Sequence, residues 1–124
     1  LNCPQSPVFI YADGLHLKRM FLNLLNNAIK FSHLGGKILI NVCTEDKKLK
    51  VSVQDTGVGI KPEYINKIFD RFFHVDNING SSEKGSGLGL SIAQSIAKIH
   101  RGDISVKSQP QKGSTFTVTL PIAD

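Results

Sequence analysis

The stretch DGLHLKRMFLNLLNNAIKFS, residues 13–32, predicts a long helix around which the rest of the fold is arranged. Asp13 is a residue type that favours the helix N-cap, and the glycine pair at 35–36 follows the last turn of the pattern. The apolar residues of the helix are Leu17, Met20, Phe21, Leu22, Leu24, Leu25, Ala28 and Ile29. Because they occupy most of its circumference, we expect the helix to be largely buried.

A polar stripe interrupts this apolar helix. Asn23, Asn27 and Lys30 stand at positions i, i+4 and i+7, which places them on one narrow face. Buried amide and ammonium groups need polar partners, because each unpaired group costs about 1–3 kcal/mol. A bound polyphosphate with its metal ion would supply partners to all three groups. A stripe that simply faces water is the alternative interpretation.

The strand predicted over residues 49–55 ends in a carboxylate that points inward. Alternation of side chains places Val51, Val53 and Asp55 on the core side of this strand. Asp55 could stabilise the turn in the sequence DTGVG, or it could accept a hydrogen bond from the amine of a buried heterocycle. In the second case, Gly57 and Gly59 would let the following loop lie close to the ring.

Three glycines at alternate positions lead into a second apolar helix. The stretch EKGSGLGLSIAQSIAKIH, residues 83–100, contains Gly85, Gly87 and Gly89. Glycine lets backbone N–H groups approach an anion, and a helix start adds unpaired donors and a positive dipole end. The segment is therefore compatible with a phosphate cradle and, equally, with a loose loop before a surface helix. Neither the Walker-type loop nor the dinucleotide fingerprint fits its spacing.

The remaining patterns predict an α/β fold, a two-layer sandwich. We expect a short helix over 62–69, a helix over 88–100, and strands over 7–12, 37–43, 49–55, 103–108 and 114–120. The polar turn TEDKK would join the second and third strands. A polar loop covers residues 74–86. Helices separated by mostly antiparallel strands favour two layers over a doubly wound parallel sheet.

Composition limits the class of protein. The chain has 124 residues, 40% of them hydrophobic, which suits one core. Two cysteines are too few for a disulfide scaffold, and no apolar run reaches the roughly 18 residues of a membrane span. The net charge of +5 suits an anionic partner, but scattered basic residues without interleaved aromatics argue against nucleic acid. We expect one soluble domain, residues 1–124, excised from a longer protein.

Five motifs occur in an order that resembles a known family. The stretches NLLNNAIKF, DTGVGI, IFDRFF, GSGLGLSIA and GSTF resemble the N, G1, F, G2 and G3 boxes of the ATP-binding catalytic domain of sensor histidine kinases. The resemblance extends from about Asp13 to Leu120. It implies the gyrase, chaperone, histidine kinase and MutL type of ATP fold, with a mixed five-stranded sheet packed under three helices.

The resemblance also implies roles for individual residues. Asp55 would accept a hydrogen bond from the adenine amino group, and Asn27 would hold Mg²⁺. Asn23, Lys30 and Arg71 are the implied catalytic residues, because they would lie beside the phosphates. The implied nucleotide site consists of Asn23, Asn27, Lys30, Phe31, Asp55, Gly57, Gly59, Ile60, Lys84, Gly85, Ser86, Gly87, Leu88, Gly89 and Thr115.

Three positions depart from the family pattern. Phe31 stands where the family often has tyrosine, and His74 stands where many relatives have a second arginine. Lys84 replaces a frequent glycine and could supply the missing positive charge. Residues 74–86 would form a mobile lid over the phosphates.

The resemblance implies transfer of the γ-phosphate of ATP to a histidine on a separate helical domain of the same protein. A response regulator would be the later partner, and the full-length protein would be a homodimer. This chain would be a cytoplasmic domain of a membrane-anchored sensor protein, with the phosphoacceptor and sensor domains outside it. The alternatives are an ATPase or serine kinase of the same fold, or a nucleotide-binding regulator without catalysis.

Asn23 distinguishes a histidine kinase from an ATPase or a serine kinase of the same fold. Hydrolysing and serine-phosphorylating relatives resemble one another in having a glutamate at this position, where it can act as general base. An amide cannot take a proton near neutral pH. The sequence therefore favours a histidine acceptor.

Overall fold

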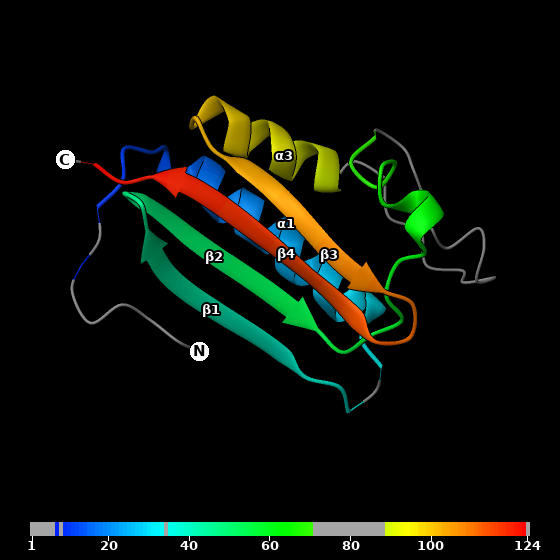
Figure 1. Cartoon of the computed structure of the whole chain (residues 1–124). Helices are drawn as coiled ribbons and strands as arrows, with labels where there is room; N and C mark the ends of the chain where they lie inside the picture. The colour runs from blue at the N-terminus through cyan, green and yellow to red at the C-terminus, as the bar shows by residue number, and fades with distance from the viewer. Residues whose placement is uncertain (1–6, 8, 34, 71–88, 124) are drawn as a thin grey trace.

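The computed structural model describes residues 7, 9–33, 35–70 and 89–123, which form two layers. One layer is an antiparallel sheet with strand order β1-β2-β4-β3, and α1 and α3 cover one of its faces (Figure 1). The elements are α1 Gly14–Phe31, β1 Ile38–Glu45, β2 Lys48–Asp55, the three-ten helix η1 Pro62–Tyr64, α3 Gly89–Ile99, β3 Asp103–Gln109 and β4 Gly113–Pro121. The predicted two-layer sandwich is confirmed.

The sheet differs from the predicted one in its strands. The described residues form four strands, all antiparallel, instead of a mixed sheet of five. Residues 9–12, predicted as part of a first strand, have no strand conformation. The N–H of Ala123 donates to the carbonyl of Phe9 at 2.7 Å, so the segment lies beside the chain after β4 without joining the sheet.

The helices also differ in number, since the described residues form two α-helices instead of three. The helix predicted over 62–69 consists of η1 followed by turns. The N–H groups of Tyr64, Lys67 and Asp70 donate to carbonyls three residues earlier, which is typical of three-ten geometry. Phe69 still belongs to the core, because its ring meets that of Phe116 edge-on with 6.2 Å between centroids.

Helix α1 begins and ends close to its predicted bounds. The Asp13 carboxylate accepts from the N–H groups of Leu15 and His16 at 3.0 and 3.2 Å, so it is the N-cap. At the other end, the hydroxyl of Ser32 donates to the carbonyl of Ala28 at 2.7 Å. The helix therefore ends before the glycine pair at 35–36.

Helix α1 is buried on one side only. Met20 and Leu24 are fully buried, whereas Leu15, Leu22 and Ile29 are 76%, 45% and 62% exposed. The expectation of a largely buried helix is wrong for this outer face, because a two-layer fold covers a helix from one side. Apolar composition alone does not say which side is covered.

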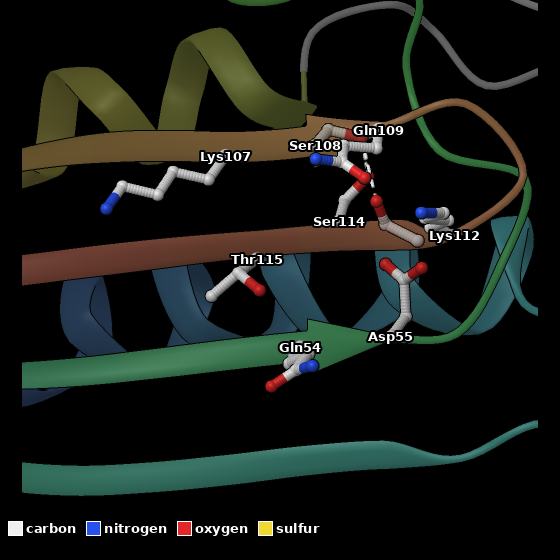
Figure 2. A pocket seen from close by; sticks show the side chains of 9 residues that line it. Gln54, Asp55, Lys107, Ser108, Gln109, Lys112, Ser114 and Thr115 are labelled. Carbon is white, nitrogen blue, oxygen red and sulfur yellow. Dashed lines mark hydrogen bonds between the residues drawn. The ribbon is translucent and has the colours of Figure 1, made fainter.

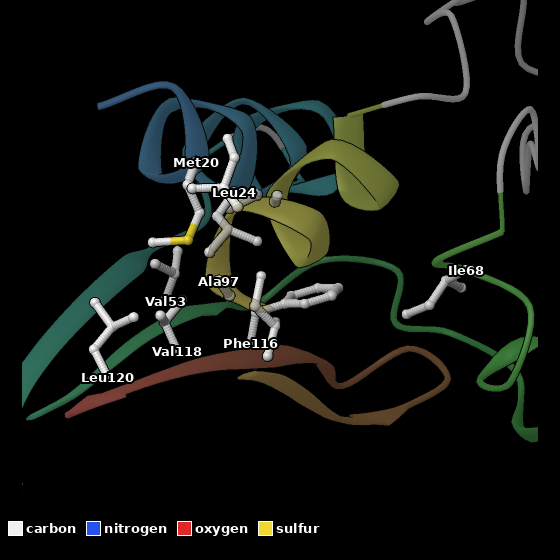
Figure 3. Close-up of a cluster of buried hydrophobic side chains, with 12 residues drawn as sticks. Met20, Leu24, Val53, Ile68, Ala97, Phe116, Val118 and Leu120 are labelled. Carbon is white, nitrogen blue, oxygen red and sulfur yellow. The ribbon is translucent and has the colours of Figure 1, made fainter. Parts of the chain in front are cut away.

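The core lies between the helices and the sheet (Figure 3). Val53 on β2 and Phe116 and Val118 on β4 face Met20 and Leu24 of α1. Asp55 follows Val53 by two residues and is buried on the same face. The predicted inward orientation of this carboxylate is confirmed.

Two residues, Asp46 and Lys47, make the turn between β1 and β2, since Glu45 pairs with Lys48. Both have left-handed backbone angles, with φ of 52° and 62°. Such turns match the twist of a hairpin, so the connection is tighter than the predicted five-residue turn.

Candidate functional site

The predicted polar stripe lies along a half-buried edge of α1. Asn23, Asn27 and Lys30 are all partly buried, whereas the neighbouring Leu22 and Asn26 are exposed. The stripe therefore lies at the border between α1 and the rest of the domain and does not simply face water.

The side-chain amide of Asn23 is a buried polar group that needs a hydrogen-bond partner. Its Nδ2 atom is buried and has no hydrogen-bond partner among the described residues. The Cγ atom of Asn23 lies 4.0 Å from the position that a Cβ would take on Gly89, the first residue of α3. An unpaired buried amide costs about 1–3 kcal/mol, so this position favours a ligand with an acceptor. The positive end of the α3 dipole would attract an anion to the same place.

The end of the stripe connects α1 to the loop after β2. The Nζ atom of Lys30 lies 5.3 Å from the centroid of the Phe31 ring, a cation–π contact. The carbonyl of Phe31 accepts from the N–H of Val58 at 3.1 Å. The backbone at the end of α1 is therefore hydrogen-bonded to the loop after β2.

Asp55 lies at the end of β2 and is 3% exposed. Its Oδ1 atom accepts from the N–H of Gly57 at 2.9 Å, which confirms the turn role. This turn uses Oδ1 and does not involve the Oδ2 atom. A carboxylate can accept more than one hydrogen bond, so Oδ2 is available to an amine donor.

Gly57 and Gly59 are required by the packing of the protein itself. A Cβ on Gly57 would lie 2.0 Å from the carbonyl oxygen of Phe31, and a Cβ on Gly59 would lie 2.0 Å from that of Gln109. Gly59 also has a φ of +71°, which L side chains rarely adopt. From the sequence, these two glycines are predicted to let the loop approach a bound ring. In the structure, each is required because a side chain there would collide with a carbonyl group of the protein itself.

Strand β4 places Ser114, and not Thr115, beside Asp55. Ser114 is the register partner of Asp55 and is 7% exposed, whereas Thr115 pairs with Gln54 on the other face. A one-residue step along a strand moves a side chain to the opposite face. Thr115 therefore points to the opposite face of the sheet from Asp55, although both residues line one cavity at this end of the sheet. Alternation counted back from the buried Phe116 would have found Ser114 from the sequence.

A cavity of about 190 Å³ lies at this end of the sheet (Figure 2). Gln54, Thr115 and Lys107 line it and form one register row across β2, β4 and β3. Asp55, Ser108 and Ser114 line the cavity as well, so side chains from both faces of the sheet surround it. None of its lining residues belongs to the stripe on α1.

The N-cap of α1 is connected to the end of α3. The Nε2 atom of His100 accepts from the N–H of Asp13 at 3.0 Å, and its Nδ1 lies 2.8 Å from the carbonyl oxygen of Ile96. Because a carbonyl only accepts, Nδ1 carries the proton. The hydrogen bond from the N–H of His16 is the main cause that lowers the pKa of the Asp13 carboxyl.

Several predicted site residues lie outside the described residues. They are Arg71, Lys84, Gly85, Ser86, Gly87 and Leu88, together with the lid predicted over 74–86. In the described ranges, no group of three or more His, Cys, Asp or Glu side chains is placed to hold a metal ion. Within the same ranges, no helix has the length and apolar character needed to cross a membrane.

Residues 12–124 match the family of histidine kinase-, DNA gyrase B- and HSP90-like ATPases. The chain belongs to this family, and the resemblance seen in its five motifs is confirmed.

The relatives identify the type of domain within the family. The chain is 40% identical to histidine kinase P4 of Formosa agariphila over 116 residues, which cover 91% of this chain and 8% of that relative. The mycobacterial sensor histidine kinase MprB has a TM-score of 0.83 and 30% identity, covering 98% of this chain and 82% of that one. Full-length ShkA in complex with AMPPNP has a TM-score of 0.84 and 29% identity, and the match covers 98% of this chain and 25% of that one. The chain is therefore a histidine kinase ATPase domain, and it spans a small part of the longer relatives.

Proposed function

We propose that this domain binds ATP with Mg²⁺ and transfers the γ-phosphate to a histidine on a separate helical domain of the same protein. The observation that supports the proposal most is the buried Nδ2 atom of Asn23, which lacks a partner among the described residues and lies beside the start of α3. A phosphate oxygen of ATP would accept the hydrogen bond that this amide lacks. AMPPNP, the ligand in the ShkA complex, is an analogue of ATP.

The adenine would lie at the other end of the site, against Asp55. The Gly57 N–H occupies Oδ1 and fixes the orientation of the carboxylate. Oδ2 would then accept from the adenine amino group. Ser114, directly across from Asp55 on β4, would take the place that the resemblance gives to Thr115.

Asn27 fits the expected Mg²⁺ ligand. It stands one helical turn from Asn23 on the same half-buried edge of α1. Its amide oxygen is a hard ligand, and magnesium commonly combines one or two protein oxygens with phosphate oxygens and water. When bound, the ion would neutralise part of the phosphate charge.

Cationic and backbone groups would complete the phosphate end. Lys30 would contact a phosphate from the last turn of α1, and Arg71 would approach the terminal phosphate. Lys84 and the backbone of residues 85–89 would enclose the triphosphate, with residues 74–86 as the lid. These roles follow from the family resemblance.

The side chain of Asn23 favours histidine as the acceptor. An amide orients a phosphate by hydrogen bonds but cannot take a proton near neutral pH. A neutral imidazole is already nucleophilic, whereas water or a serine hydroxyl needs a general base. The proposal therefore prefers a histidine kinase over an ATPase or a serine kinase.

The partners follow from this reaction. The phosphoacceptor helical domain would receive the phosphate and pass it to a response regulator, and the full-length protein would be a homodimer. The domain, residues 1–124, would act in the cytoplasm and reach the membrane only through segments outside this chain.

Calorimetric titration with ATP·Mg²⁺ and with adenosine tests the placement of the nucleotide. Asn23→Ala should weaken ATP binding but leave adenosine binding unchanged, because Asn23 is placed at the phosphates. Its unfolding temperature should not fall, since the change removes an unpaired buried amide. Asn26→Ala is the matched control on the exposed face of α1. Equal loss of ATP and adenosine affinity in Asn23→Ala would refute the placement.

A further inference from the structure

The hydroxyl of Ser108, near the end of β3, contacts three segments of the chain. Its Oγ atom lies 2.7 Å from the N atom of Ile60 and 2.9 Å from the carbonyl oxygen of Gly113. It also lies 2.7 Å from the Oγ atom of Ser114 (Figure 2). Ile60 belongs to the loop after β2, and Gly113 and Ser114 begin β4. One partly buried side chain therefore connects the elements that surround Asp55.

The number of hydrogens fixes the direction of these bonds. A serine hydroxyl has one hydrogen to donate and two lone pairs that accept. The N–H of Ile60 can only donate to Ser108, and the carbonyl of Gly113 can only accept from it. Ser108 has then used its hydrogen, so the third bond requires the hydroxyl of Ser114 to donate. The Oγ atom of Ser114 can therefore offer only lone pairs to any further partner.

The direction of the Ser114–Ser108 hydrogen bond matters because Ser114 lies beside Asp55. Ser114 is the register partner of Asp55 on the same face of the sheet, and Cβ atoms of such partners lie about 4.5–5.5 Å apart. The Oδ2 atom of Asp55 is also an acceptor. The two side chains together form a floor of acceptors, which attracts a donor such as an amino group and repels a carbonyl oxygen.

We propose that Ser108 is a positioning residue for base selection. By holding the Ser114 hydroxyl as an acceptor, it makes the site prefer a 6-amino purine over a 6-oxo purine. The inference rests on the proposed function, since it takes the base to lie against Asp55. Ser108 acts through Ser114 and need not touch the nucleotide.

Calorimetry with ATP·Mg²⁺ and inosine triphosphate·Mg²⁺ tests the proposal on the 124-residue chain. The measured quantity is the ratio of the Kd for inosine triphosphate to the Kd for ATP. In Ser108→Ala the freed Ser114 hydroxyl can rotate and donate to the 6-oxo group, so the ratio should fall about three- to tenfold. Ser108→Thr keeps the hydroxyl and should keep the ratio. Ser105→Ala, on the exposed face of the same strand, should leave it unchanged.

A purely structural role gives a different result. If Ser108→Ala weakens both nucleotides by the same factor, or changes neither Kd, the proposal is refuted. Ser114→Ala must also lower the ratio, and Ser108→Ala added to it must lower it no further. This second variant decides the question if Ser108→Ala does not fold. Absence of ATP binding by the unchanged chain would instead refute the proposed function.

Discussion

Asn23 on α1 and Gly89 at the start of α3 lie next to each other, with 4.0 Å between the Cγ atom of Asn23 and the Cβ position of Gly89. Two motifs that are far apart in the sequence therefore lie side by side in the fold. A separation of 4.0 Å is an ordinary contact, so packing among the described residues does not require glycine at position 89. The approach of a phosphate to the backbone would require it.

Gly89→Ala should therefore separate folding from binding. We expect no loss of stability, and a gain of up to about 1 kcal/mol, because alanine favours the helix. ATP affinity should fall, since a methyl group would stand where the phosphates approach. Thermal unfolding and calorimetric titration measure the two effects. A stable variant with unchanged ATP affinity would show that Gly89 does not line the phosphate site.

Asp55→Asn should weaken ATP and ADP alike while the fold is kept. The amide oxygen can still accept from the N–H of Gly57, so the turn after β2 survives. The amide NH₂ would then replace Oδ2 and present hydrogens to the adenine amino group. We expect at least about a tenfold loss in affinity, because a charge-assisted acceptor becomes an opposed donor. Unchanged nucleotide affinity in a folded variant would exclude Asp55 from the base site.

Some of these features can be derived from the sequence by local rules. The Asp13 cap, the bounds of α1 and the inward carboxylate of Asp55 follow from capping and strand alternation. Which side of α1 is exposed does not follow from such local rules, because it depends on how many layers cover the helix in the folded protein. Residues 9–12 have strand propensity but do not join the sheet. Thr115 was predicted from a motif match without applying the register that places Ser114 beside Asp55.

Asn27→Ala should remove the effect of Mg²⁺ on ATP binding. The wild-type chain should bind ATP more tightly when Mg²⁺ is added, because the ion would join the phosphates to the Asn27 amide oxygen. Asn26→Ala changes the same residue type one position away on the exposed face and should behave like wild type. Asn27 would be excluded as the metal ligand if its variant still gains affinity normally on addition of Mg²⁺.

The stability of α1 should depend on pH through Asp13. The N–H of His16 holds the pKa of this carboxyl below its ordinary value of 3.8. A lowered pKa in the folded state stabilises the fold above the unfolded-state pKa, and this contribution is lost as the pH falls through the folded-state pKa. Asn is also a good N-cap but does not titrate, so Asp13→Asn is the control. Between about pH 6 and about pH 3, wild type should lose more unfolding temperature than this variant. Parallel losses would exclude a titrating cap.

The acid lability of the transferred phosphate is the measurement that tests the central claim most directly. The 124-residue chain is incubated with γ-labelled ATP·Mg²⁺, alone and with the phosphoacceptor helical domain of its parent protein. Because Asn23 cannot act as a base, the chain alone should bind ATP and hydrolyse it very slowly. With the helical domain present, label should appear on that domain in an acid-labile and base-stable form, as phosphohistidine does. Rapid hydrolysis by the chain alone, or acid-stable label on a partner serine, would contradict the assignment.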